Sequence, residues 1–95
     1  MDADITVTRN DERSRFEATL GGQLAGYSEY RLGESRIEFT HTVVDDAFEG
    51  KGVGSALVSR ALDQVRADGL DVVATCPFVR SYIDRHEEYA DLLAS

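Results

Sequence analysis

The stretch Glu49-Gly50-Lys51-Gly52-Val53-Gly54-Ser55 decides the fold, because the residue pattern changes on either side of it. Three glycines at alternate positions allow a sharp turn and let a ligand approach the backbone N–H groups. Downstream, apolar residues recur every three or four positions, which predicts a helix that ends before Gly69. The buried face of this helix is predicted to comprise Val53, Leu57, Val58, Ala61, Leu62 and Val65.

Four strands joined by short turns are predicted upstream of the glycine turn. Apolar and polar residues alternate over 5–9, 15–20, 23–31 and 36–44, although less regularly in the third segment. This period of two is typical of half-buried strands. Gly21-Gly22 suits the positive φ of a hairpin turn. The segments therefore predict an antiparallel meander, with no room for a helix between the first two strands.

Downstream of the predicted helix, residues 70–75 contain the apolar run Val72-Val73-Ala74. Such a run indicates a strand that is central in the sheet or parallel to its neighbour. Pro77 suits the first position of a second helix, whose buried side is predicted to carry Phe78, Tyr82 and Ile83. The fold class is therefore α+β, in the order β-β-β-β-α-β-α, with a mostly antiparallel sheet in one domain spanning residues 1–95.

Composition narrows the classes of partner. The chain has 95 residues and a formal net charge of −8, which argues against nucleic acid or an anionic membrane as the main partner. No apolar run approaches the ~18 residues of a membrane span, and the acidic start lacks the features of a signal peptide. The lone cysteine, Cys76, suits a reducing compartment. We therefore expect a cytoplasmic protein.

The glycine turn is a candidate anion site. It precedes a helix, where free N–H groups and the helix dipole favour a phosphate or pyrophosphate, and Lys51 adds a positive charge. The P-loop and dinucleotide-binding motifs do not match its spacing. A glycine-rich connection that binds no ligand is the alternative.

Further motifs carry a resemblance to a known family. Thr75-Cys76-Pro77-Phe78, Arg85-His86 and His41-Thr42 accompany the glycine turn. Together they resemble a compact subgroup of the GNAT superfamily of N-acetyltransferases, over residues 3–92. The resemblance implies acetyl-CoA as acyl donor, no metal, and a sheet splayed between its fourth and fifth strands. It also implies that the pantetheine arm lies between 41–44 and 72–76.

The resemblance further implies a set of acetyl-CoA contacts. A backbone N–H near Val43 would stabilise the oxyanion. Glu49 departs from the Gln or Arg of the family motif, so we expect it to point to solvent or to pair with a base. The predicted contacts are Val43, Val44, Glu49, Gly50, Lys51, Gly52, Val53, Gly54, Ser55, Cys76, Phe78, Tyr82 and Arg85.

Four residues are candidates for catalysis. Cys76 stands at a helix start, which stabilises a thiolate, so it either carries the acetyl group, lines the thioester pocket or packs in the core. His41 and Glu38 are candidate bases, but both serve only if a bulge changes the strand register; otherwise His41 shares the core face of its strand. Tyr82 either protonates the departing CoA thiolate, as the resemblance implies, or is a core aromatic.

These observations predict an acetyl-CoA-dependent N-acetyltransferase. The acceptor is a primary amine: a protein lysine, a protein amino terminus or a small polyamine. Its positive charge would be attracted by an acidic surface. The alternative is a CoA-binding regulatory module without acceptor chemistry. We expect a monomer or a weak dimer.

Overall fold

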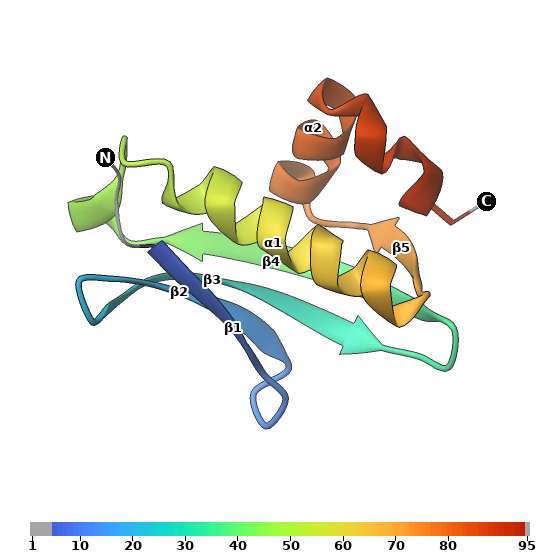
Figure 1. Ribbon diagram of the computed structural model, residues 1–95, viewed down its shortest axis with the longest axis horizontal. Helices are drawn as coiled ribbons and strands as arrows, with labels where there is room; N and C mark the ends of the chain where they lie inside the picture. The colour runs from blue at the N-terminus through green and yellow to red at the C-terminus, as the bar shows by residue number, and fades with distance from the viewer. Residues whose placement is uncertain (1–4, 95) are drawn as a thin grey trace.

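The computed structural model describes residues 5–94 and confirms the predicted order of strands and helices (Figure 1). Two short 3-10 helices, η1 after the fourth strand and η2 at the end, are added to that order. The elements are β1 (Ile5–Asn10), β2 (Arg15–Leu20), β3 (Gln23–Leu32), β4 (Arg36–Val44), η1 (Asp46–Phe48), α1 (Val53–Asp68), β5 (Asp71–Ala74), α2 (Pro77–Arg85) and η2 (Glu87–Leu92).

The strands form one sheet in the order β1-β2-β3-β4-β5. The first four pair antiparallel in sequence, as the meander predicts. β5 pairs parallel to β4 and lies at the edge of the sheet. The prediction of a parallel strand is therefore confirmed, whereas a central position for this strand is wrong.

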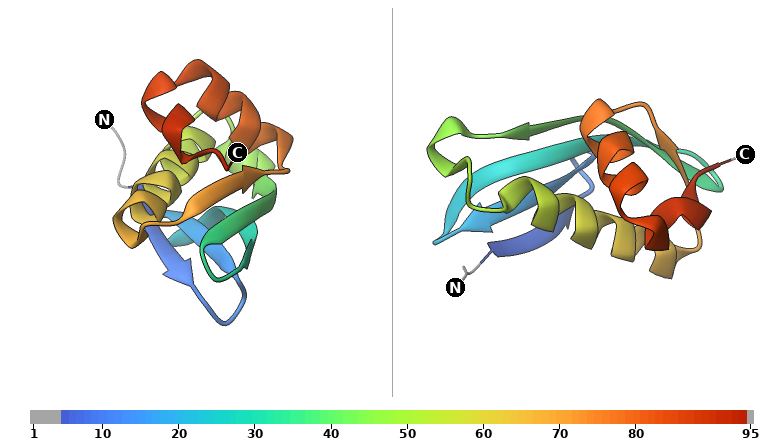
Figure 2. Two further views of the ribbon diagram at one scale, coloured as in Figure 1. Left: turned by 90° about the vertical axis from the view of Figure 1, so that its right-hand side faces the viewer. Right: turned by 90° about the horizontal axis from the view of Figure 1, so that it is seen from above.

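Both helices pack on one face of the sheet. Figure 2 shows the sheet curving around α1, with α2 beside it over β4 and β5. All six apolar residues predicted to face the core from α1 are buried. In α2, Val79 is buried with Tyr82 and Ile83, whereas Phe78 remains 39% exposed. Within residues 5–94, no helix covers the opposite face of the sheet, and no helix has the length and apolarity to cross a membrane.

A bulge in β4 changes which side chains face the core. Tyr30 of β3 pairs with Phe39, but the preceding Glu29 pairs with His41, so Thr40 is an extra residue on β4. Phe39 is buried, whereas His41 and Val43 are exposed on the uncovered face. The prediction that His41 and Val43 share the core face with Phe39 is therefore wrong, because regular alternation ends at the bulge.

β4 and β5 separate where the bulge begins. Pairing runs only from Arg36 to Phe39 on β4 and from Asp71 to Ala74 on β5. The Cys76 N–H then donates to the Phe39 carbonyl at 2.8 Å, and the chain turns into α2 at Pro77. The sheet is therefore splayed between its fourth and fifth strands, and among the described strands nothing pairs with the β5 side of β4 beyond Phe39.

Candidate active site

The glycine loop presents free backbone donors at the start of α1. Gly50 and Gly52 have φ of 80° and 78°, in the left-handed region that favours glycine. The Ala56 N–H donates to the Gly52 carbonyl at 3.0 Å, as the first bond of the helix, and no side chain of residues 5–94 caps this end. The preceding N–H groups, through Ser55, therefore have no acceptor within the helix.

These donors border a cleft of about 240 Å³. The cleft is lined by Val44, Phe48, Glu49, Gly50, Gly52, Val53, Gly54, Ser55 and Phe78. All but Phe48 belong to the predicted acetyl-CoA contacts; Phe48 was missed because it lies between the patterned segments. A β-carbon on Gly54 would lie 2.6 Å from Cζ of Phe78. Gly54 therefore leaves room for the aromatic wall of the cleft.

The cleft reaches the unpaired edge of β4 at Val44. The Asp45 N–H donates to the Ala25 carbonyl at 2.8 Å. Since antiparallel pairing alternates, the N–H of Val43 also faces β3, and the N–H groups of Thr42 and Val44 face the open edge. The Val43 carbonyl faces β3 as well, because a β-carbon built on Gly26 of β3 would lie 2.7 Å from its oxygen. The oxyanion donor expected near Val43 stays a prediction, and among the N–H groups around that position those of Thr42 and Val44 face the open edge.

Cys76 lies at the point where β4 and β5 separate. It is the N-cap residue of α2 and is 1% exposed. Its thiol donates to Oγ1 of Thr42 at 3.4 Å, and Thr42 Oγ1 lies 2.9 Å from Oγ of the fully buried Ser28. Sequence reasoning missed the hydroxyls of Thr42 and Ser28, because their partners come from two other elements.

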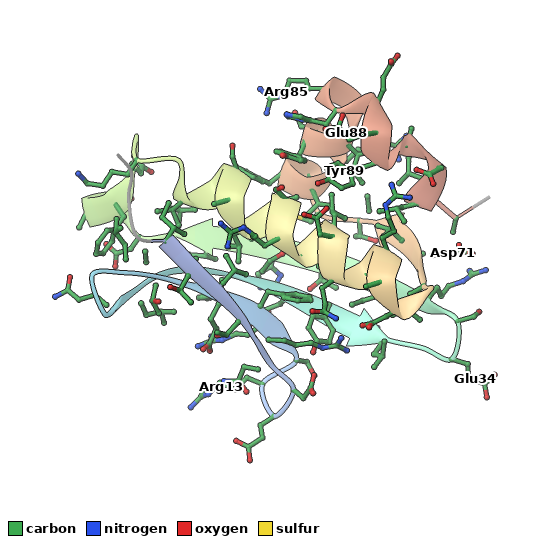
Figure 3. The ribbon with its side chains drawn as sticks, viewed as in Figure 1. Arg13, Glu34, Asp71, Arg85, Glu88 and Tyr89 are labelled. Atoms are coloured by element: carbon green, nitrogen blue, oxygen red, sulfur yellow. The ribbon has the colours of Figure 1, made fainter. Side chains whose placement is uncertain are left out.

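Tyr82 and Arg85 occupy different parts of α2. Tyr82 is 6% exposed and stacks on His86, with ring centroids 3.9 Å apart. It is absent from the described cleft lining, so its packing favours a core aromatic, and its role as an acid stays a prediction. Arg85 is exposed, and Figure 3 shows it at the end of α2 away from the sheet. Its contact with CoA phosphates also stays a prediction.

Glu38 and His41 lie on the uncovered face, as the bulge allows, but they point in different directions. Glu38 accepts a 2.6 Å hydrogen bond from Oγ1 of Thr75, next to Cys76. Nε2 of His41 lies 2.7 Å from Oε1 of Glu29 on β3, a partner that sequence reasoning missed. Glu38 therefore lies beside the gap between β4 and β5, whereas His41 is turned away from it.

The charges at the cleft are mixed. Glu49 is exposed at its lining, and Lys51 is exposed in the same loop. Within residues 5–94 neither forms an ion pair. No cluster of three or more metal-ligating side chains is found in that range.

Groups with clearly shifted pKa values lie outside this site. Hydrogen bonds from Tyr30 and Arg9 lower the pKa of Asp11 on the β1–β2 turn. Burial raises the pKa of Tyr89 on η2. These groups fasten the turn and the C-terminal segment, and neither belongs to the cleft or the gap.

Comparisons with known proteins agree with this geometry. Residues 15–92 match the family model described as GCN5-related N-acetyl-transferase. Protein NATD1 of Xenopus tropicalis is 30% identical over 82 residues, which cover 83% of this chain and 74% of that protein. The human Protein NATD1 is also 30% identical over 82 residues, covering 83% of this chain and 72% of the relative.

Solved structures share the fold. The NMR structure of a GCN5-like putative N-acetyltransferase from Staphylococcus aureus has a TM-score of 0.71 at 22% identity, covering 95% of this chain and 88% of that one. The crystal structure of Ard1 from Thermoplasma volcanium has a TM-score of 0.61 at 22% identity, covering 77% of this chain and 54% of that one.

Proposed function

The chain belongs to the GCN5-related N-acetyltransferase family, whose members use acetyl-CoA as donor, and from this we propose direct acetyl transfer to a primary amine. The observation that carries the proposal is the proximity of two features. The cleft at the start of α1 reaches the unpaired edge of β4 at Val44, and Thr42, two residues before Val44 on that edge, contacts Cys76. A donor bound there would have its thioester at the gap between β4 and β5.

The cleft and the edge fit different parts of acetyl-CoA. The free N–H groups at the start of α1 suit the pyrophosphate. Val44 lines this cleft, so its N–H would meet the pantetheine arm as the arm leaves the phosphates. Thr42 lies two residues before Val44 on β4 and contacts Cys76. We therefore propose that its N–H stabilises the oxyanion that forms from the thioester carbonyl.

The acceptor would approach from the uncovered face. Glu38 lies on that face beside the gap, where its carboxylate can remove a proton from the acceptor ammonium. The freed nitrogen attacks the thioester carbonyl, the C–S bond breaks, and the CoA thiolate takes a proton from water. The Cys76 thiol contacts Thr42 on the helix-covered side of the sheet. The amine and Cys76 therefore flank the thioester from opposite sides, which favours direct attack over an acetyl-cysteine intermediate.

Acetyl-CoA consumption with a panel of amines tests this proposal. We expect release of free CoA that depends on the amine, measured with a thiol reagent, and an acetylated product detected by mass spectrometry. Peptide mapping should show no acetyl group on Cys76. Acetyl-Cys76 that forms without amine and is discharged when amine is added would establish a two-step route instead.

The regulatory module is the second candidate, and the observation that favours it is Glu49 at the cleft lining. A carboxylate at this position opposes a pyrophosphate without preventing weaker binding. CoA binding measured by thermal stabilisation, with no turnover on any amine, would support the regulatory module and contradict the proposed acetyl transfer.

Glu49→Gln is expected to tighten acetyl-CoA binding. Removing one like charge beside the pyrophosphate should lower KM for acetyl-CoA by about 3- to 10-fold. The gain should shrink at high salt, because exposed charges are screened.

The matched control is Glu34→Gln. Glu34 is exposed on the β3–β4 turn, and Figure 3 shows it at the opposite end of the molecule from the glycine loop. An equal effect of both substitutions would mean that net charge, rather than the position of Glu49, sets the affinity.

A further inference from the structure

We propose that the acceptor is a lysine side chain within a polypeptide that lies on the uncovered face of the sheet. In that polypeptide, the residues on one side of the lysine (one flank) would be apolar and those on the other side (the other flank) would be acidic. This inference rests on the proposed acetyl transfer and deepens it, because it selects one class of amine and excludes free polyamines.

The uncovered face places one row of polar side chains across three strands. Arg15 of β2 is opposite Glu29 of β3, and Glu29 is opposite His41 of β4. In a neighbouring row, Arg31 of β3 is opposite Glu38 of β4. Glu29 and His41 therefore lie together near the middle of the face, and Glu38 lies beside the gap where the thioester would lie.

Three hollows open along this face, and two of them adjoin at Arg31. Their volumes are about 110 Å³ around Tyr27 and Val43, about 350 Å³ around Glu29 and His41, and about 380 Å³ around Arg31 and Glu38. A small molecule is usually enclosed by a single concave pocket. A row of open hollows instead suits an extended polypeptide, whose successive side chains occupy separate sites.

The hollow at one end is mostly apolar, with Asp45 as the charged residue in its lining. Leu24 and Val43 line it and are 46% and 41% exposed. Tyr27 lines it too, and the Arg15 guanidinium stacks on the Tyr27 ring at 4.3 Å from its centroid. Since this stacking and strand pairing hold the ring in place, the hollow is preorganised for an apolar side chain.

The opposite end is rich in arginine. Arg13 and Arg31 line the hollow that contains His41, and Arg31 and Arg36 line the one that contains Glu38. Within residues 5–94, Arg13, Arg31 and Arg36 form no ion pair. They are therefore available to a carboxylate of the acceptor.

This balance of charge selects against polyamines. Glu38 and Glu29 can attract one ammonium, and Glu29 is already in contact with His41. On the arginine side, a second cation would meet Arg13 or Arg31, which repel it. A polypeptide with a single amine and an acidic flank satisfies both conditions.

A comparison of acceptor peptides tests the inference. Peptides with blocked ends would carry a central lysine, a leucine flank on one side and a glutamate flank on the other, in both orders. We expect kcat/KM for the better order to exceed that of the matched peptide with an arginine in place of glutamate by about tenfold. Spermidine and peptides with a free amino terminus as their only amine should be poorer acceptors.

Arg31→Glu supplies the charge-reversal variant. It should invert the preference toward the peptide with the basic flank and leave acetyl-CoA affinity unchanged. Arg60→Glu makes the same charge change on the exposed side of α1, which packs on the other face of the sheet. It should leave the preference for the acidic flank intact. Leu24→Asp should remove the preference for a leucine flank over a serine flank.

The outcomes separate this inference from the proposed function. Preferred acetylation of spermidine or of an amino terminus would overturn the inference while the acetyltransferase proposal stands. Failure to acetylate any amine would overturn the proposed function. Binding of the acetylated product peptide, followed by NMR shifts, then decides the inference: shifts at Tyr27, Val43 and Arg31 support it, and their absence overturns it.

Discussion

Glu38→Gln is expected to lower kcat/KM by about 10²- to 10⁴-fold, the usual range for loss of a general base. The Gln amide oxygen can still accept the hydrogen bond from Thr75, so the side chain should keep its position. What it loses is the ability to take a proton from the acceptor ammonium. The fold should be unaffected, because Glu38 is only partly buried on the uncovered face.

The pH profile identifies the cause of this loss. The deficit of Glu38→Gln should shrink as the pH rises toward the lysine pKa of about 10.4, because the amine then arrives already deprotonated. His41→Gln is the matched control, since His41 is turned toward Glu29; its expected loss is below about tenfold. A larger loss in His41→Gln than in Glu38→Gln would assign the base to His41 instead.

Thr42→Pro is expected to lower kcat by about 10²- to 10³-fold, the usual cost of losing one oxyanion donor. Proline removes the N–H that faces the open edge of β4. Because that N–H takes no part in pairing with β3, the substitution should be tolerated as on an edge strand. Rates at saturating acetyl-CoA measure the effect.

Thr42→Val separates the side chain from the backbone. Valine keeps the N–H and removes the hydroxyl that contacts Cys76 and Ser28. Both variants leave the buried Ser28 without that partner, so both should lose about 1–3 kcal/mol of unfolding free energy. Only Thr42→Pro should lose most of its activity. Equal rates in the two variants would show that the Thr42 N–H is not the oxyanion donor.

Much of the fold was predictable because its signals are local. The apolar spacing of α1 depends on the helical period, and its end at Gly69, with φ of 73°, depends on the conformational freedom of one residue. Gly21 and Gly22, with φ of 61° and 82°, mark a hairpin for the same reason. The glycine loop was predictable too, since alternate glycines before a helix specify both the turn and its free donors.

The bulge in β4 was not predictable from alternation. Residues 36–44 alternate regularly in the sequence, so Ile37, Phe39, His41 and Val43 were placed on one face. Only pairing with β3 shows that Thr40 is an extra residue and that the side chains exchange faces beyond it. This exchange turns Glu38 and His41 to the same face and sends the N–H of Thr42 to the open edge.

By itself, the sequence determined the order of the elements, the glycine loop and the family motifs, since each depends on residues that are neighbours in the chain. The tertiary structure decided which N–H groups on β4 are free, and it showed that Cys76, Thr42 and Ser28 meet. It also showed that no helix among residues 5–94 covers the second face of the sheet. These features depend on strand register and on contacts between distant elements, and a one-residue change in register moves every side chain beyond it to the other face.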